Sequence, residues 1–141
     1  MSVEEEIKKA ALELVSGTPI VMLGNNGPDG YPGIKAMIKM ENEGLRTFWF
    51  STNTSSKRVG QLRKDGKACV YLVDMKSWRG LMLLGEVEVL EDPAAKRRLW
   101  RDGFEKYYPK GVTDPDYCVL RFTALRGNYY HNLHNSDFAI D

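Results

Sequence analysis

The sequence has few cysteines, almost no net charge and no long apolar run, and each of these absences excludes a class of protein. Its two cysteines, Cys69 and Cys118, do not have the spacing of a zinc site or a CxxC redox motif. With 20 Lys and Arg against 19 Asp and Glu, the formal net charge of +1 gives no basis for a nucleic-acid or membrane surface. No apolar run approaches the roughly 20 residues that span a bilayer. We therefore expect reduced cysteines, no nucleic-acid partner and no membrane contact.

A targeting signal is also missing from the sequence. The first residues, Met1 to Glu6, are acidic and lack the basic-then-apolar order of a secretory signal. The length of 141 residues fits one domain, residues 1–141, that can bury its own core. We expect a cytoplasmic protein, in which the Asn53-Thr54-Ser55 glycosylation sequon has no meaning.

Three patterns that could signal a nucleotide, metal or nucleophile site are weak. Gly60–Ala68 is similar to a P-loop, but it has one residue too many between its glycines, and Ala68 replaces the magnesium-binding Ser or Thr. His131, His134 and Asp137 could gather a metal only if their polar segment were helical and supported by neighbouring groups. No Ser-His-Asp or Cys-His arrangement has support. We expect no metal site and no protein nucleophile.

Hydrophobic periodicity and turn residues predict an α+β protein. Helices are predicted over Ser2–Val15, with a Ser2–Glu5 capping box, over Ser56–Lys64, and from Ala94 to about Tyr108. Strands are predicted over Thr18–Leu23, Tyr31–Met40, Leu45–Thr52, Lys67–Asp74, Leu81–Leu90 and Tyr117–Thr123, with Leu125–His131 as a candidate edge strand before a polar tail. A short turn joins Tyr31–Met40 to Leu45–Thr52, so we expect these two strands to pair. Six antiparallel strands with helices at the joints favour a barrel or strongly curved sheet.

The segment Phe48–Arg58 has the most informative local pattern. An aromatic run ends a predicted strand, small polar residues follow, and the cations Lys57 and Arg58 begin a helix. Cations in the first turn of a helix are unfavourable by about 0.3 to 1 kcal/mol each, because the helix dipole is positive there. A dianion would reverse this effect, since the cations, the helix N–H groups and the turn hydroxyls would all stabilise it. The pattern therefore indicates a phosphate-binding turn.

A simpler interpretation of this segment stays open. Ser55 or Ser56 could be an ordinary N-cap beside solvated cations, and the aromatic side chains before the turn could be core residues. Lys35 and Lys39 favour the anion site. On a strand beside Leu45–Thr52, one of these lysines could extend to the turn or to a ring attached to the phosphate.

Four segments of the chain carry a family resemblance. They are Tyr31–Met37, Phe50–Lys57, Leu84–Val89, and Tyr108–Val112 with Asp114–Tyr117. In this order, over nearly the whole chain, they resemble the pyridoxamine 5'-phosphate oxidase-like FMN-binding split barrels, and within them the general stress protein branch. The resemblance implies a six-stranded antiparallel split β-barrel with flanking helices. It also implies a homodimer with FMN in the groove between its subunits.

The resemblance further implies which residues bind FMN. Thr52, Ser56 and Lys57 would hold the phosphate, Lys35, Ala36, Met37, Phe50 and Ser51 would line the ribityl chain and the flavin edge, and Asn53 belongs to the same turn. Tyr129 would supply an aromatic contact from the partner subunit. The chain departs from the family at two positions: Lys35 replaces a frequent Arg, which loses the bidentate fork, and Tyr129-Tyr130 replaces a common Tyr-Trp pair.

No catalytic residue is identified, and two functions stay open. The first is an FMN-dependent oxidoreductase that acts on a small molecule or is reduced by a nicotinamide donor, with the flavin carrying the chemistry. The second is a non-enzymatic flavin-binding module for stress conditions. Haem or a deazaflavin, which related split barrels accept, is a weaker alternative ligand. The sequence stops at Asp141 without the extension that holds pyridoxal phosphate in the full oxidase, so we do not expect pyridoxamine phosphate as substrate.

Overall fold

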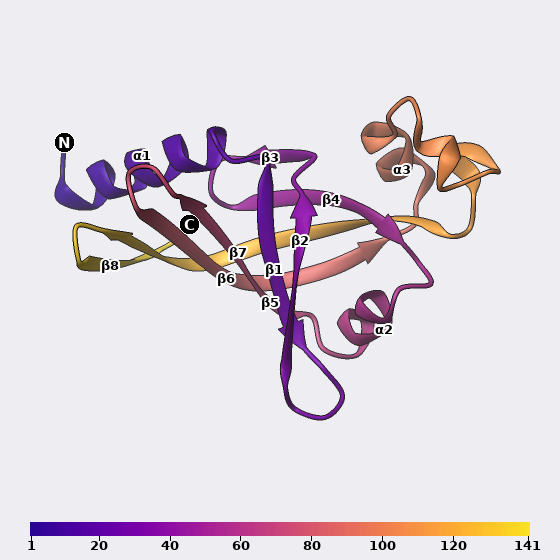
Figure 1. The fold of residues 1–141 in the computed structure, drawn as a ribbon, viewed down its shortest axis with the longest axis horizontal. Helices are drawn as coiled ribbons and strands as arrows, with labels where there is room; N and C mark the ends of the chain where they lie inside the picture. Colours follow the sequence, from indigo (N-terminus) through magenta and orange to yellow (C-terminus); the bar gives the residue numbers. More distant parts are fainter.

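Eight antiparallel strands form one curled sheet, with helices along its margins (Figure 1). The structure is a computed structural model that describes residues 1–141. The helices are α1 (Val3–Ser16), α2 (Lys57–Lys64) and α3 (Pro93–Leu99), with short 3-10 turns at Phe104–Lys106 and Gly111–Thr113. The strands are β1 (Ile20–Asn26), β2 (Pro32–Ile38), β3 (Glu41–Glu43), β4 (Thr47–Asn53), β5 (Lys67–Asp74), β6 (Arg79–Leu90), β7 (Tyr117–His131) and β8 (His134–Ala139). None of the helices combines the length and the apolarity that a membrane span needs.

Strand β7 organises the sheet because it is shared by three neighbours. The strand order is β2-β1-β5-β6-β7-β4-β3, and β8 pairs with β7 outside this order. The first half of β7 pairs with β4, from Asn53↔Tyr117 to Thr47↔Thr123, and its second half pairs with β8. Although β2 and β4 lie near opposite ends of the order, the sheet curls until they contact each other. This curled α+β architecture confirms the predicted split barrel.

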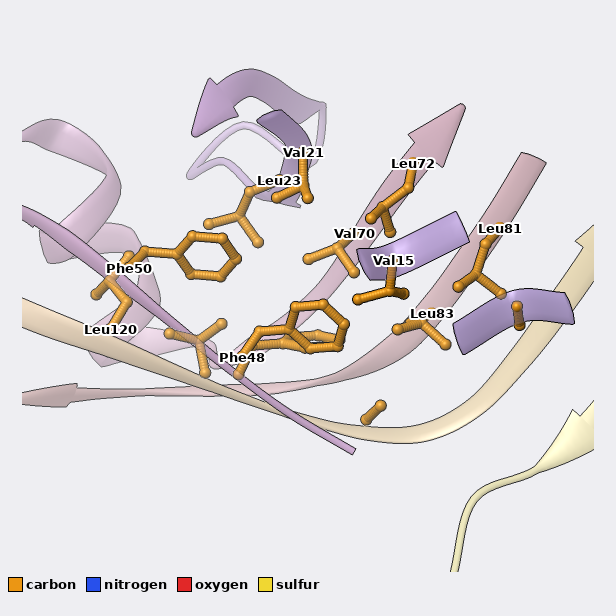
Figure 2. Packing of buried hydrophobic residues seen from close by; sticks show 14 of the residues in the cluster. Val15, Val21, Leu23, Phe48, Phe50, Val70, Leu72, Leu81, Leu83 and Leu120 are labelled. Carbon is orange, nitrogen blue, oxygen red and sulfur yellow. The ribbon is translucent and has the colours of Figure 1, made fainter. Parts of the chain in front are cut away.

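The concave face of the sheet holds the main hydrophobic core. Figure 2 shows Phe48 and Phe50 of β4 pointing toward Leu23 of β1 and Val70 of β5, and all four side chains are fully buried. Helix α1 covers this core with Ala11, Leu14 and Val15. A second, smaller cluster lies on the other face of β4 and β7, under α3 and the 3-10 turns. Its buried members are Trp49, Leu99, Tyr108, Tyr117 and Val119.

Helix α1 begins and ends on side-chain contacts. Its N-cap Ser2 accepts the N–H of Glu5 at 3.1 Å, but the Glu5 carboxylate bonds the Ser2 hydroxyl instead of the Ser2 backbone N–H. Only half of the predicted capping box therefore forms. At the other end, the Lys39 ammonium donates to the carbonyl of Val15 at 2.7 Å, where a cation is favourable.

The predicted pairing of Tyr31–Met40 with Leu45–Thr52 is wrong. The predicted strand ends at Ile38. Its first part, β2, pairs with β1, and a separate short strand, β3, pairs with β4. The tight β3–β4 turn at Gly44 satisfies the hairpin signal locally, and it leaves β2 free to complete the first hairpin. The strand count rises from six to eight because β3 and β8 were not predicted.

Two predictions in the C-terminal half are also wrong. Helix α3 ends at Leu99 instead of continuing to Tyr108, because Trp100 turns to extended backbone and packs edge-on against Phe104 and Tyr117. The predicted polar tail is strand β8, which follows a two-residue turn with positive φ at Asn132 and Leu133. The predicted sixth strand and edge strand are one continuous strand, β7.

Candidate functional site

The β4–α2 turn ends in a helix start that carries cations and free N–H groups. Ser56 is the N-cap, and its hydroxyl accepts the N–H of Val59 at 3.2 Å, so the ordinary capping interpretation is correct for Ser56. Lys57 and Arg58 follow it, and the first turn of α2 holds no acid. The backbone N–H groups of Lys57 and Arg58 have no acceptor within the chain. Two N–H donors and a cation therefore face outward at the positive end of the helix dipole.

The other side of the turn is closed by the segment before β7. Asp116 accepts the backbone N–H of Thr54 through its carbonyl at 2.7 Å and that of Ser55 through its carboxylate at 2.8 Å. The Thr54 hydroxyl donates to the carbonyl of Pro115 at 2.9 Å. The N–H groups of Thr54 and Ser55 therefore brace the turn, and only its helix side is open to an anion.

A free edge of β4 continues from the turn. The neighbouring strand β3 pairs with β4 only as far as Trp49, where the N–H of Met40 donates to the Trp49 carbonyl at 3.0 Å. Backbone groups alternate in direction along a strand, so the N–H and C=O of Ser51 point to the same side as those of Trp49, where no strand continues. These groups can bond the polar edge of a planar ring.

The predicted β2 residues divide between the two faces of the sheet. Lys35 lies opposite Leu23 of β1 and shares its concave face with Met37, which packs against the main core. Ala36 points to the convex face. The Lys35 ammonium has no partner in the chain, whereas Lys39 bonds Val15 and does not extend to the turn. Burial lowers the pKa of Lys39. The structure thus leaves Lys35 as the β2 cation with a free ammonium.

Phe50 and Ser51 belong to different layers. Phe50 is fully buried in the main core, which confirms the core interpretation for this ring. The Ser51 hydroxyl faces the second cluster and lies 3.5 Å from the hydroxyl of Tyr117. Tyr117 donates to the carbonyl of Lys96 at 3.0 Å, and burial raises the pKa of Tyr117, which keeps its hydroxyl protonated. The Ser51 side chain is therefore turned away, and Ser51 can contact a ligand at the free edge of β4 through its backbone.

A buried polar network under α2 was not predicted from the sequence. The guanidinium of Arg58 donates from Nη1 to the Leu23 carbonyl at 2.8 Å and to Oδ1 of Asn25 at 2.7 Å. Asn25 in turn donates to Oε1 of Gln61 at 3.0 Å. Nε of Arg58 is the one buried side-chain nitrogen or oxygen without a partner, and burial lowers the Arg58 pKa. Asn25 lies in β1, beyond Leu23, where the predicted strand ends.

Of the remaining predicted residues, two lie at the β4–α2 turn and the others lie far from it. Thr52 is half-buried at the end of β4, and Asn53 donates to the Ser55 hydroxyl at 2.9 Å. Tyr129 is buried in the main core at the other end of β7. Within the chain it does not meet the turn, and its ring packs in the core. His131 and His134 face each other across the β7–β8 turn, and no three potential ligands gather there.

A family model described as "Pyridoxamine 5'-phosphate oxidase like" matches residues 5–140 of the chain. The chain belongs to this family. Its general stress protein branch is also supported, because a crystal structure from Clostridium acetobutylicum, of a protein related to general stress protein 26 of B. subtilis, is 50% identical. The match covers 99% of this chain and 98% of that protein, with a TM-score of 0.88. No curated protein matches the sequence.

Two more distant solved structures share the fold. A heme binding protein from Mycobacterium smegmatis is 17% identical, with a TM-score of 0.76 over 94% of this chain and 57% of that one. A pyridoxamine 5'-phosphate oxidase-related, FMN binding protein from Nostoc punctiforme is 14% identical, with a TM-score of 0.63 over 100% of this chain and 98% of that one. At such identities the likeness shows a common architecture, within which more than one cofactor is bound.

Proposed function

We propose that this protein binds FMN at the β4–α2 turn of a homodimer and acts as a flavin-dependent oxidoreductase on a small molecule. The observation that carries the proposal is the start of α2, where two unbonded backbone N–H groups and the free Lys57 ammonium meet in a first turn without an acid. Such a helix start is stabilised by a bound phosphate. FMN brings a phosphate and a planar ring with a polar edge, and the free edge of β4 suits that ring edge.

The donor set at the turn fits a phosphomonoester. Four donors at the turn have no partner in the chain. They are the backbone N–H groups of Lys57 and Arg58, the Lys57 ammonium and the Thr52 hydroxyl. Ser56 already accepts the N–H of Val59, but its own hydroxyl hydrogen stays available. Phosphate oxygens accept from such donors, and charge-assisted bonds of this kind are roughly twice as strong as neutral ones.

The homodimer is supported by the convex face of the sheet. Apolar side chains between 41% and 68% exposed gather over β1, β2 and β5, where cross-strand neighbours such as Ile20 and Ile38 share a face: Ile20, Met22, Ile34, Ile38 and Tyr71. A monomer rarely exposes such a contiguous patch. A second copy of the chain would cover it and remove these side chains from water.

A bound flavin would supply the redox chemistry, because it accepts and releases electrons through its ring system. The chain's own residues would bind and orient it. The start of α2 would fix the phosphate, the backbone of Ser51 would fix the ring edge, and the free ammonium of Lys35 would offset negative charge on the reduced ring. A nicotinamide or a reduced small molecule is the electron donor that suits this arrangement.

The first test is the visible spectrum of the purified protein, followed by anaerobic addition of NADH or NADPH. We expect flavin bands that bleach on reduction. Flavin bands that no nicotinamide bleaches would favour the non-enzymatic flavin-binding module. A sharp haem band with no flavin would contradict the FMN assignment, and a colourless protein that takes up no added FMN would contradict it as well.

The second test asks whether Lys57 recognises the phosphate. Lys57→Ala should weaken FMN binding about tenfold or more and riboflavin binding less than twofold, since riboflavin lacks the phosphate. Lys9→Ala, an exposed helical lysine without an ion pair in α1, is the matched control. Dissociation constants from flavin fluorescence quenching provide the measurement. Equal losses for the two flavins would exclude a phosphate-binding role for Lys57.

A further inference from the structure

A polar cavity lies beside the β4–α2 turn, between the tip of the β1–β2 hairpin and one face of α2. Its volume is about 600 Å³, and none of its lining residues is hydrophobic. Residues 26–28 of the hairpin form one wall, and Lys57, Gly60, Gln61 and Lys64 form the other. In Figure 1 the hairpin tip and α2 lie at the same end of the molecule. The cavity thus runs along the helix, away from the β4 edge.

The helix wall of this cavity offers mainly hydrogen-bond donors. The ammonium groups of Lys57 and Lys64 have no ion pair or hydrogen bond in the chain. Gln61 is held with Oε1 accepting from Asn25 at 3.0 Å, which leaves its two amide hydrogens unbonded. The one acid, Asp65, already accepts from Asn26 at 3.0 Å and from the Lys67 N–H at 3.1 Å. These two bonds lower the Asp65 pKa, the Asn26 bond most. The cavity therefore suits a ligand rich in acceptor oxygens.

Gly60 gives an independent sign that a ligand approaches this wall. A glycine inside a helix is less stable than alanine would be, and it is usually explained by close packing or by function. Close packing does not explain Gly60, because a Cβ placed there would meet no atom within 4 Å, and its φ is not positive. Gly60 lies between Lys57 and Lys64 on the cavity wall. Its missing side chain lets a bound molecule lie close to the helix backbone.

The spacing of the lysines defines the class of ligand. Lys57 and Lys64 are two helical turns apart, a rise of about 10 Å, so a single phosphate does not suit both ammonium groups. We propose that this cavity binds the diphosphate group of a nucleotide, with Lys57 and Lys64 at its two ends and Gln61 donating between them. FMN carries one phosphate, so this is a site beyond the proposed flavin site, with which it shares Lys57.

Pyrophosphate is the probe for this proposal, titrated by calorimetry into the full chain with and without saturating FMN. Pyrophosphate should bind in both cases and more tightly than inorganic phosphate, but less tightly when FMN is present, because the two sites share Lys57. Lys64→Gln should weaken pyrophosphate about tenfold and leave FMN binding within twofold, whereas Lys9→Gln should change neither. Gly60→Ala should raise the melting temperature by about 3 °C and still weaken pyrophosphate, a combination that a purely structural glycine would not give.

Several results would overturn the diphosphate site. Absence of pyrophosphate binding, equal losses in Lys64→Gln and Lys9→Gln, or unchanged binding in Gly60→Ala would each contradict it. Simple competition between pyrophosphate and FMN would assign the cavity to the FMN phosphate instead. The proposed function fails separately. A protein that binds pyrophosphate but no FMN would retain the diphosphate site and lose the flavin assignment.

Discussion

Arg58 has an unusual position for the second residue of a helix. Arg58 as a whole is 9% exposed, and its guanidinium lies under α2 and donates to two oxygens of β1, Leu23 O and Asn25 Oδ1. A cation there is opposed both by the helix dipole and by loss of solvent, and the second effect lowers the Arg58 pKa. The two short hydrogen bonds offset these penalties, and they tie the start of α2 to the end of β1.

Removal of this guanidinium is expected to destabilise the fold. Arg58→Met would leave the Leu23 carbonyl and the Asn25 side chain without their donor, at about 2 kcal/mol of unfolding free energy. Arg63→Met on the same helix removes only an exposed ion pair with Glu91 and should cost less than about 1 kcal/mol. Urea denaturation measures both. Equal losses in the two variants would show that the Arg58 network contributes little.

Lys35 and Lys39 show what a sequence can and cannot specify at the level of single residues. Alternation along the strand places both ammonium groups on one face, as predicted. Their separate roles depend on α1, because Val15 offers its carbonyl to Lys39 at 2.7 Å and offers nothing to Lys35. That contact joins residues from two elements whose relative position no local pattern encodes. The same reason explains why the bond of Asp116 to Ser55 was not foreseen.

At the level of elements, the long β6–β7 pair contains the one register irregularity of the sheet. Its register shifts between Leu84 and Gly85, as in a β-bulge. Gly85 has no room for a side chain, because a Cβ there would lie 2.0 Å from the Thr123 carbonyl oxygen of β7. The β6 backbone therefore makes a close crossing over β7 at the bulge, while the strands stay paired on both sides of it, from Gly80↔Tyr130 to Leu90↔Val119. A bulge increases the local twist of a strand pair, so Gly85 contributes to the curl of the sheet.

A methyl group at this crossing should therefore be poorly tolerated. Gly85→Ala is expected to lower the unfolding free energy by about 3 kcal/mol, since backbone and not a flexible side chain must move. Gly33→Ala in β2 is the matched control, because a Cβ there meets nothing within 4 Å and the effect should stay within about 0.5 kcal/mol. Thermal and urea unfolding of both variants measure the difference. Similar stabilities would refute the packing explanation.

Elements with strong local signals were predicted well, and those decided by packing were not. The bounds predicted for β5, Lys67–Asp74, are those observed, since alternation and the preceding glycine both mark them. Helix α2 was predicted over Ser56–Lys64 and is observed over Lys57–Lys64, with Ser56 as its N-cap. Helix α3 ends early because the rings of Trp100, Phe104 and Tyr117 pack together across distant segments. Strand β8 has one buried apolar residue, Phe138, so its alternation was too weak to recognise.

At the level of the whole molecule, one face of the sheet is apolar and uncovered. The concave face is filled by the main core and the outer face of β4 and β7 by the second cluster, but the convex face of β1, β2 and β5 stays exposed. Apolar area of this kind is stabilised when a partner removes it from water, by about 25 cal/mol per Å². The proposed homodimer thus explains the apolar convex face.

A charge in this patch should break the dimer without unfolding the subunit. Ile38→Glu, 63% exposed in the monomer, is expected to shift the mass measured by light scattering from dimer to monomer and to weaken FMN binding. Leu125→Glu, 59% exposed outside the patch, should leave both unchanged. Circular dichroism checks that each variant is folded. A dimer that survives Ile38→Glu would place the interface elsewhere.

The brace that Asp116 gives the β4–α2 turn also has a kinetic meaning. The bond from the Ser55 N–H to Asp116 joins residues 61 positions apart, and β4 meets β7 over similar separations. Contacts between such distant residues form slowly, because the chain loses the entropy of closing a long loop before the stabilising bonds form. A nascent chain that has not reached Asp116 contains every residue of the turn but lacks its support. The turn therefore acquires its final shape late in synthesis, when the last third of the chain joins the sheet.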